Sequence, residues 1–336
     1  MMFKFTLTTV LQRFLIAGLL AVTPGHAENQ TPVIIGTDSW LFTSYELANA
    51  SDAKDTEASL QLIARMNQLF EQRGIALALV IVPSKVRIYA DKLPNAALLD
   101  RYTADKYAVL VKRLTETGVK VVNLNQAFLK NEKRNSDTPL FLRLDTHWSP
   151  SGALLAAETI KATIDSTPTL NDAWSKTVEE KYTLSWAKQK TVHRARDLIK
   201  FLPKDAAPYA PEQVLQFAVS RQQTSQADLL SEADDVKIVA IGSSYSDKNT
   251  GYPDALRYTL QRNILDISIP ALQGPWVGME SYLRDEAFTN QKPNLVIWEI
   301  PEREFRSPPD YKFREARYIV GNEEWLARVT ALFMPN

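Results

Sequence analysis

An aspartate and a histidine two positions apart, in the stretch RLDTHWSPSG at 143–152, are the residues of this sequence best suited to acid–base chemistry. The chain has three histidines, and His26 lies in an N-terminal segment that reads as removable, which leaves His147 and His193. On an extended segment, Asp145 and His147 can point the same way, so that the carboxylate orients the imidazole. Two other interpretations stay open: a metal site, although no HxxxH or HExxH spacing is present, and a loop histidine satisfied by hydrogen bonds.

A second group of polar residues follows an apolar run, in IVAIGSSYSD at 238–247. The run predicts a strand that ends at Gly242 and is followed by Ser243 and Ser244. Open α/β sheets bind ligands just past the carboxyl ends of their strands, and a helix that starts there directs backbone N–H groups at an anion. The alternative is that Ser243 and Ser246 only cap a helix. Together with the Asp–His pair, a strand-end serine completes the minimal set for nucleophilic acyl transfer.

The apolar pattern of the chain predicts the elements that position these residues. Strands are predicted at 75–83, 118–124, 236–242, 265–270 and 294–301, and helices at 56–74, 99–117, 150–164, 254–264 and 322–333. Uniformly apolar strands that alternate with helices indicate an α/β fold with a parallel sheet covered on both faces. The polar stretch 166–235 has no strong strand signal and is predicted to be an insertion or lid within this domain.

The first residues of the chain have the pattern of an export signal. Lys4 and Arg13 form a positively charged region before a short apolar run at 14–22. Small residues then precede a cleavage point after Ala27. We expect a periplasmic protein with residues 1–27 as signal peptide and 28–336 as a single domain. An uncleaved inner-membrane anchor is the alternative, although the run is shorter than the roughly 20 residues of a membrane span.

Composition excludes several classes of function. The chain has no cysteine, which excludes thiol catalysis, disulfides and cysteine metal sites. The 39 basic side chains are balanced by 39 acidic ones, for a formal net charge of +0. A nucleic acid is therefore not an expected partner.

Five stretches that occur in order between about residues 34 and 306 carry a family resemblance: GTDSWLF (36–42), VPSKVRIYADKLP (82–94), DTHWSPSGA (145–153), IGSSYSD (241–247) and IWEIPEREF (297–305). Together they resemble the periplasmic alginate O-acetyltransferase family, whose members have an SGNH-hydrolase-like domain. The resemblance implies a flavodoxin-like three-layer fold with a circularly permuted motif order, because the Asp–His pair precedes the serine. Ser39 stands where the first stretch usually has glycine, and Ser243 where Asp or Thr usually precedes the nucleophile.

The resemblance also implies a reaction. Ser244 aligns with the family's nucleophile, and Asp145 and His147 align with its Asp-x-His pair. The implied function is acetyl transfer to an exported polysaccharide, alginate or a similar polymer, through an acetyl-serine, without metal or cofactor. The implied partners are a membrane-bound O-acyltransferase as acetyl donor and other envelope export and acetylation proteins. A carbohydrate acetylesterase with the same triad, or a non-catalytic polysaccharide-binding component, is the alternative.

Other residues are assigned more loosely by the same resemblance. Gly274 in ALQGPW, and Tyr245 beside the nucleophile, are candidates for the oxyanion or substrate site. Lys85 and Arg303 either face the cleft and bind an anionic sugar or are structural, with Arg303 paired to Glu299 or Glu302.

Two tryptophans complete the set of candidates. Trp40 and Trp148 either stack on a sugar ring or pack in the core.

Overall fold

The apolar strands predicted from the sequence assemble into one five-stranded parallel sheet. The computed structural model describes residues 32–222, 236–270 and 273–334, which belong to one compact unit. The strands of the sheet are β3 (Ala76–Val82), β4 (Lys120–Asn123), β9 (Ile238–Gly242), β10 (Leu265–Ser268) and β11 (Leu295–Pro301). Each lies within a few residues of its predicted range.

The spatial order of the strands is β10-β9-β11-β3-β4. Counted along the chain from β9 and continued past the C-terminus to β3, this order becomes 2-1-3-4-5, the order of flavodoxin-like sheets. The sheet is therefore a circular permutation of that fold, as the motif order implied. The order reverses between β9 and β11, and a reversal of this kind is where open α/β sheets place their ligand sites.

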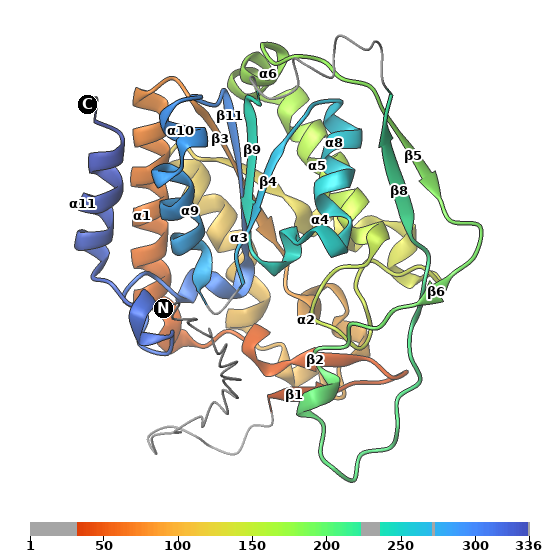
Figure 1. Ribbon diagram of the computed structural model, residues 1–336. Helices are drawn as coiled ribbons and strands as arrows, with labels where there is room; N and C mark the ends of the chain where they lie inside the picture. Colours follow the sequence, from red (N-terminus) through yellow and green to blue (C-terminus); the bar gives the residue numbers. More distant parts are fainter. Residues whose placement is uncertain (1–31, 223–235, 271–272, 335–336) are drawn as a thin grey trace, which may run out of the picture. The chain divides into compact units, whose positions relative to one another are not determined.

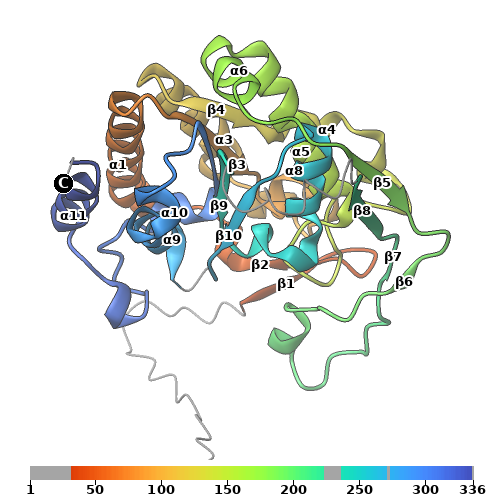
Figure 2. The same ribbon diagram turned by 45° about the horizontal axis from the view of Figure 1, so that its top comes forward.

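Helices cover both faces of the sheet, as Figures 1 and 2 show. One face carries α1 (Ala53–Gln72), α3 (Arg101–Glu116), α9 (Gly274–Arg284) and α11 (Asn322–Leu332), with the short α10 (Glu286–Thr289) beside α9. The other face carries α4 (Leu124–Lys130), α5 (Pro150–Ser166), α6 (Pro168–Ser175) and α8 (Tyr252–Leu260). The short α2 (Lys85–Ile88) follows β3 directly.

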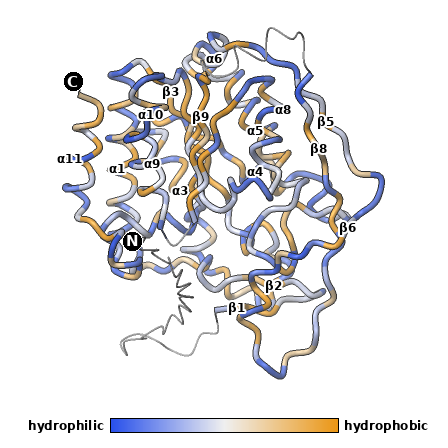
Figure 3. The backbone as a smooth tube through the Cα atoms, in the orientation of Figure 1, coloured by the Kyte–Doolittle hydropathy of each residue, from blue (hydrophilic) through white to orange (hydrophobic). Residues whose placement is uncertain are grey.

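The uniform apolar character of the strands follows from this layering. In β3, Leu77, Leu79 and Ile81 pack with the first group of helices, whereas Val80 and Val82 pack with the second. Both sets of side chains are buried, so the central strands β3, β9 and β11 have no solvent face, whereas the edge strands β4 and β10 are only partly buried. Figure 3 shows the strands as the apolar centre of the molecule.

The stretch 166–235 contains more regular structure than the sequence indicated. Within its described part, β5 (Tyr182–Trp186) pairs with β8 (Phe217–Arg221), and β6 (Thr191–Val192) pairs with β7 (Gln213–Val214), both antiparallel. These ribbons are short and half exposed, which explains the weak strand signal. Residues 193–212 form an excursion loop between β6 and β7 that reaches the hairpin of β1 (Val33–Ile35) and β2 (Leu41–Thr43) (Figures 1 and 2).

The hairpin turn explains one departure from the family pattern. Ser39 has a φ of 62°, in the left-handed region that glycine adopts most easily. A glycine at this position in related chains therefore fits the same turn. The predicted signal peptide at 1–27 lies outside the described residues. Within them, no helix combines the length and apolar character that crossing a membrane requires.

Candidate active site

Ser244 lies directly after the carboxyl end of β9, at the reversal of strand order. Ser243 begins a single 3-10 turn over Ser244–Ser246, and its hydroxyl accepts the Tyr245 N–H at 3.2 Å. Gly242 is required for the close packing of this turn. A Cβ on Gly242 would lie 2.5 Å from Glu299 Oε2 and closer still to the Ser246 hydroxyl. Position 242 therefore has no room for a side chain.

A buried carboxyl supports the turn from below. Glu299, in β11, is 1% exposed and accepts hydrogen bonds from the Ser243 N–H at 2.8 Å and from the Ser246 hydroxyl at 3.0 Å. The Ser243 hydroxyl also donates to it. Burial raises the pKa of Glu299 to about 7, despite these donors. The sequence had suggested Glu299 only as a partner of Arg303.

His147 connects Ser244 to Asp145 by two short hydrogen bonds. Its Nε2 lies 2.8 Å from Ser244 Oγ, and its Nδ1 lies 2.6 Å from Asp145 Oδ1. With the ring proton on Nδ1, that atom donates to the carboxylate and Nε2 accepts the serine O–H. Asp145 is 2% exposed. Burial raises its pKa, but the hydrogen bond and charge of His147 outweigh this effect and hold the pKa at about 2.

The helix start that follows the pair fixes its direction. The Ser149 hydroxyl accepts the Gly152 N–H at 3.3 Å as the N-cap of α5, and Pro150 is the first helical residue. Because α5 packs on the sheet next to α8, the loop before it is held at the carboxyl end of β9. This loop, residues 143–147, is called the 143–147 loop below.

The three side chains have the geometry of an acyl-transfer site. Nε2 is placed to take the hydroxyl proton of Ser244 while the carboxylate balances the imidazolium. Among the described residues, the backbone N–H of Ser244 has no hydrogen-bond acceptor. It is therefore free to donate to an oxyanion that forms at the serine.

Tyr245 is buried and joins the Ser244–Ser246 turn to the 143–147 loop. Its hydroxyl donates to the Thr146 carbonyl at 2.6 Å, and its ring centroid lies 5.0 Å from that of His147. Burial raises the pKa of Tyr245, which keeps the hydroxyl protonated as a donor. Arg303 donates to the same hydroxyl at 3.4 Å and pairs with Glu46 at 3.4 Å.

The predicted pairing of Arg303 with Glu299 or Glu302 was wrong. Its ion pairs are with Glu46 and Glu304, and its side chain is 12% exposed. Tyr245 and Arg303 thus form a largely buried polar network that adjoins the His147 ring through Tyr245.

Lys85 is buried within the protein and does not face a cleft where it could bind a sugar. It is 1% exposed, and its Nζ donates to the carbonyls of Leu41, Arg143 and Asp145 at 2.6, 3.0 and 3.0 Å. All three N–H groups are therefore used within the protein. Burial lowers the pKa of Lys85 to about 8. Its structural role is to hold the carbonyl side of the 143–147 loop.

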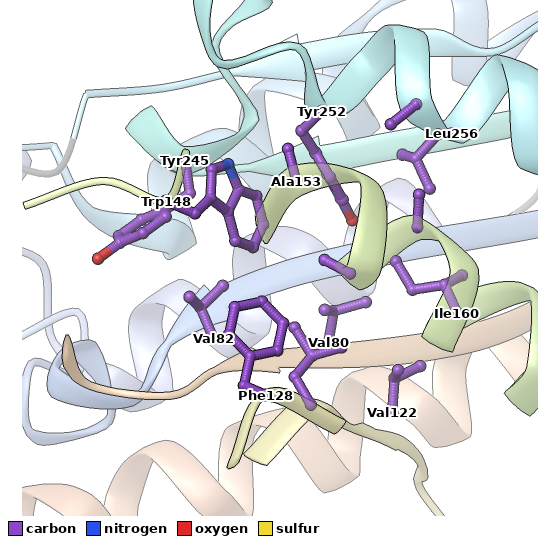
Figure 4. Close-up of a cluster of buried hydrophobic side chains, with 14 of the residues drawn as sticks. Val80, Val82, Val122, Phe128, Trp148, Ala153, Ile160, Tyr245, Tyr252 and Leu256 are labelled. Atoms are coloured by element: carbon purple, nitrogen blue, oxygen red, sulfur yellow. The ribbon is translucent and has the colours of Figure 1, made fainter. Parts of the chain in front are cut away.

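The two tryptophans take the core alternative. Trp148 is 1% and Trp40 is 5% exposed. Figure 4 shows Trp148 and Tyr245 in the buried cluster that also contains Val82 and Phe128. Neither indole presents a face to solvent on which a sugar ring can stack.

Gly274 is the first residue of α9, with a φ of 78°. A Cβ there would lie 2.5 Å from the Arg314 guanidinium carbon. Among the described residues no hydrogen bond joins Gly274 to the Ser244 turn. Its assignment as an oxyanion donor stays a prediction.

Asp197 is a residue of the site that the sequence analysis missed. It lies in the excursion loop, and its backbone N–H donates to Asp145 Oδ2 at 3.0 Å. With Asp145 and His147 it forms a group whose potential metal-ligating atoms all lie within 4.8 Å of one another. Each of these atoms is engaged by hydrogen bonds with protein groups. His193 lies outside this group.

Comparisons with known proteins agree with the geometry. Residues 33–302 match the family model described as SGNH hydrolase-like domain, acetyltransferase AlgX. The probable alginate O-acetylase AlgJ of Pseudomonas fluorescens is 30% identical over 287 residues, covering 82% of this chain and 69% of that protein. The corresponding protein of Pseudomonas aeruginosa is 28% identical over 322 residues, covering 90% and 76%.

Solved structures show the same fold. The O-acetyltransferase domain of Pseudomonas putida AlgJ superposes with a TM-score of 0.71 at 23% identity, covering 90% of this chain and 99% of that one. AlgX of Pseudomonas aeruginosa gives a TM-score of 0.64 at 17% identity, covering 90% and 66%. The predicted family, the SGNH-like fold and the enzyme class, an O-acetyltransferase, are confirmed. The chain belongs to the family of SGNH-hydrolase-like domains described for the acetyltransferase AlgX.

Proposed function

We propose that this enzyme acetylates an exported polysaccharide in the periplasm through an acetyl-serine on Ser244. The observation that carries the proposal is the continuous chain of hydrogen bonds from Asp145 through His147 to Ser244, at 2.6 and 2.8 Å. A serine hydroxyl is a weak nucleophile at neutral pH unless an adjacent base removes its proton. His147 has that position, and Asp145 fixes its tautomer.

In the first half-reaction, Ser244 Oγ attacks the carbonyl carbon of an acetyl ester while His147 Nε2 takes the hydroxyl proton. The tetrahedral oxyanion is stabilised by the Ser244 N–H, with Gly274 as the second proposed donor. When the intermediate collapses, the ester C–O bond breaks and His147 returns the proton to the leaving alcohol. The acetyl group is then bound to Ser244.

In the second half-reaction, a sugar hydroxyl takes the place of the leaving alcohol. His147 removes its proton as the oxygen attacks the acetyl carbonyl, and Ser244 leaves with that proton. Product and free serine are formed with no net proton change. Neither half-reaction calls for a metal or nucleotide, so no cofactor is proposed.

The relatives guide the choice of acceptor and partners. Curated relatives are named for alginate O-acetylation, so alginate is the first acceptor to test. A membrane-bound O-acyltransferase is the proposed donor, because the acetyl group must cross the inner membrane. Other envelope export and acetylation proteins are the further proposed partners.

Mass spectrometry of the protein after incubation with an acetyl-ester donor tests the proposal. We expect an acetyl adduct on the peptide that contains Ser244, and its loss when an acceptor oligosaccharide is added. The variant S244A should form no adduct and transfer no acetyl group. S281A, which removes an exposed hydroxyl from α9, is the matched control and should behave as wild type.

Two results would contradict the proposal. Acetyl transfer by S244A at the wild-type rate would exclude an acetyl-serine on this residue. Release of free acetate without acetylated sugar, for every acceptor offered, would make the enzyme an acetylesterase.

A further inference from the structure

The 143–147 loop carries the acid–base pair, yet most of its backbone N–H groups are bonded by the inserted segment and not by the sheet. Glu212 is 4% exposed, and its carboxylate accepts the N–H of Arg143 at 2.6 Å and that of Leu144 at 2.9 Å. The Asp197 carboxylate accepts the N–H of Thr146 at 2.8 Å. Two carboxylates of the excursion loop thus accept three of the five backbone N–H groups of the 143–147 loop.

Asp197 also fixes the two side chains that neighbour the imidazole. Its backbone N–H donates to Asp145 Oδ2, and its second carboxylate oxygen accepts the Thr146 hydroxyl at 2.5 Å. Because Asp145 Oδ1 is taken by His147, the Asp197 N–H occupies the other oxygen of the same carboxylate. A carboxylate terminal torsion is otherwise broad, so bonds on both oxygens define its plane.

An apolar contact fastens the excursion loop in place. Leu198 is fully buried. It packs in one apolar cluster with Leu144 of the 143–147 loop and with Val33 and Leu41 of the β1–β2 hairpin. Its N–H reaches the Leu144 carbonyl at 3.3 Å. The polar contacts of Asp197 are therefore attached to a packed anchor one residue further along the chain.

Lys85 completes the arrangement from the opposite side. Its ammonium binds the carbonyls of Arg143 and Asp145, while the two carboxylates bind N–H groups of the same loop. Ionised donors and acceptors form stronger hydrogen bonds than neutral ones. The 143–147 loop is thus held between one buried cation and two acidic side chains.

We propose that Asp197 and Glu212 are positioning residues for the Asp145–His147 pair, and that the excursion loop that carries them is a clamp for the 143–147 loop. The inference rests on the proposed function, because the clamp matters only if His147 acts on Ser244. The clamp touches no reacting atom. It sets the direction of the imidazole, and a misplacement of about 1 Å in such a group costs on the order of a hundredfold in rate.

Kinetics of Asp197 variants test the clamp. We expect D197A to lower kcat for acetyl transfer by about a hundredfold with KM unchanged within about twofold. D197N keeps an acceptor oxygen for the Thr146 N–H but loses the charge. Its kcat should therefore be about tenfold higher than that of D197A and remain below that of the wild type. D205A removes an exposed aspartate from the same excursion loop and is the matched control, with wild-type kcat.

A serine-reactive sulfonyl probe counts the competent sites in each preparation and so separates positioning from loss of folded protein. Reduced kcat per labelled site in D197A supports the clamp, whereas wild-type kcat per labelled site overturns it. If D197A does not fold, T146V gives the same test, because it removes the hydroxyl that Asp197 accepts. Failure of the proposed function has a different signature: the wild type is not labelled at Ser244, and S244A stays active.

Discussion

Replacing Glu299 with glutamine probes the buried carboxyl that accepts hydrogen bonds from Ser243 and Ser246, on either side of Ser244. The pKa of Glu299 is raised from 4.5 to about 7 in the folded protein by burial. Between these pH values the native carboxyl keeps a proton that the unfolded chain releases. The stabilisation from the protonated form is therefore complete below about pH 4.5 and is lost as the pH rises through about 7.

The size of this effect follows from the two pKa values. Their difference corresponds to about 3 kcal/mol of unfolding free energy. Glutamine stays neutral at every pH, its carbonyl accepts the Ser243 N–H, and rotated serine hydroxyls accept its amide N–H. The difference in stability between wild type and E299Q should therefore shift by about 3 kcal/mol between about pH 4.5 and 8, in favour of E299Q at the higher pH.

Urea unfolding followed by tryptophan fluorescence, at a series of pH values, measures this difference. Other titrating groups are shared by both proteins and cancel. E323Q, at an exposed position of α11, controls for the loss of a carboxyl. A wild-type minus E299Q difference that stays flat across this range would show that the carboxyl is ionised throughout, and the reasoning from burial would fail.

Three further changes have defined outcomes. D145N should lower kcat by roughly four orders of magnitude, since an amide favours the wrong tautomer of His147; a loss below about tenfold would contradict the role proposed for Asp145. G242A should reduce both activity and melting temperature, because its Cβ meets Ser246 and Glu299, whereas G321A, at the N-cap of α11 and with its nearest neighbour at 3.8 Å, should leave activity unchanged. K85M removes the ammonium that binds three carbonyls, of which that of Arg143 keeps the Leu41 N–H as a second donor, and should cost at least about 2 kcal/mol in urea unfolding; unchanged stability would refute the role given to Lys85.

The sequence was informative where chemistry and periodicity are local. The Asp-x-His spacing, the strand-end serine and the helix start at Ser149 and Pro150 each depend on neighbours in the chain. They single out three side chains that the fold joins by hydrogen bonds, and their catalytic roles stay a proposal. The apolar strands were predictable for the same reason, because burial on both faces leaves a continuous run of apolar residues.

The tertiary structure decided what lies between distant segments. Asp197 and Glu212 lie in a polar stretch, and no feature of the neighbouring sequence indicates that their carboxylates accept hydrogen bonds from backbone N–H groups some 50 to 70 positions earlier. Lys85 and Arg303 looked equally suited to bind a sugar or the protein, and burial with specific partners placed both inside. The Asp145–His147 pair can thus be recognised from the sequence alone, whereas the proposed clamp could not be, because its hydrogen bonds join segments that no periodic pattern relates and that only folding brings together.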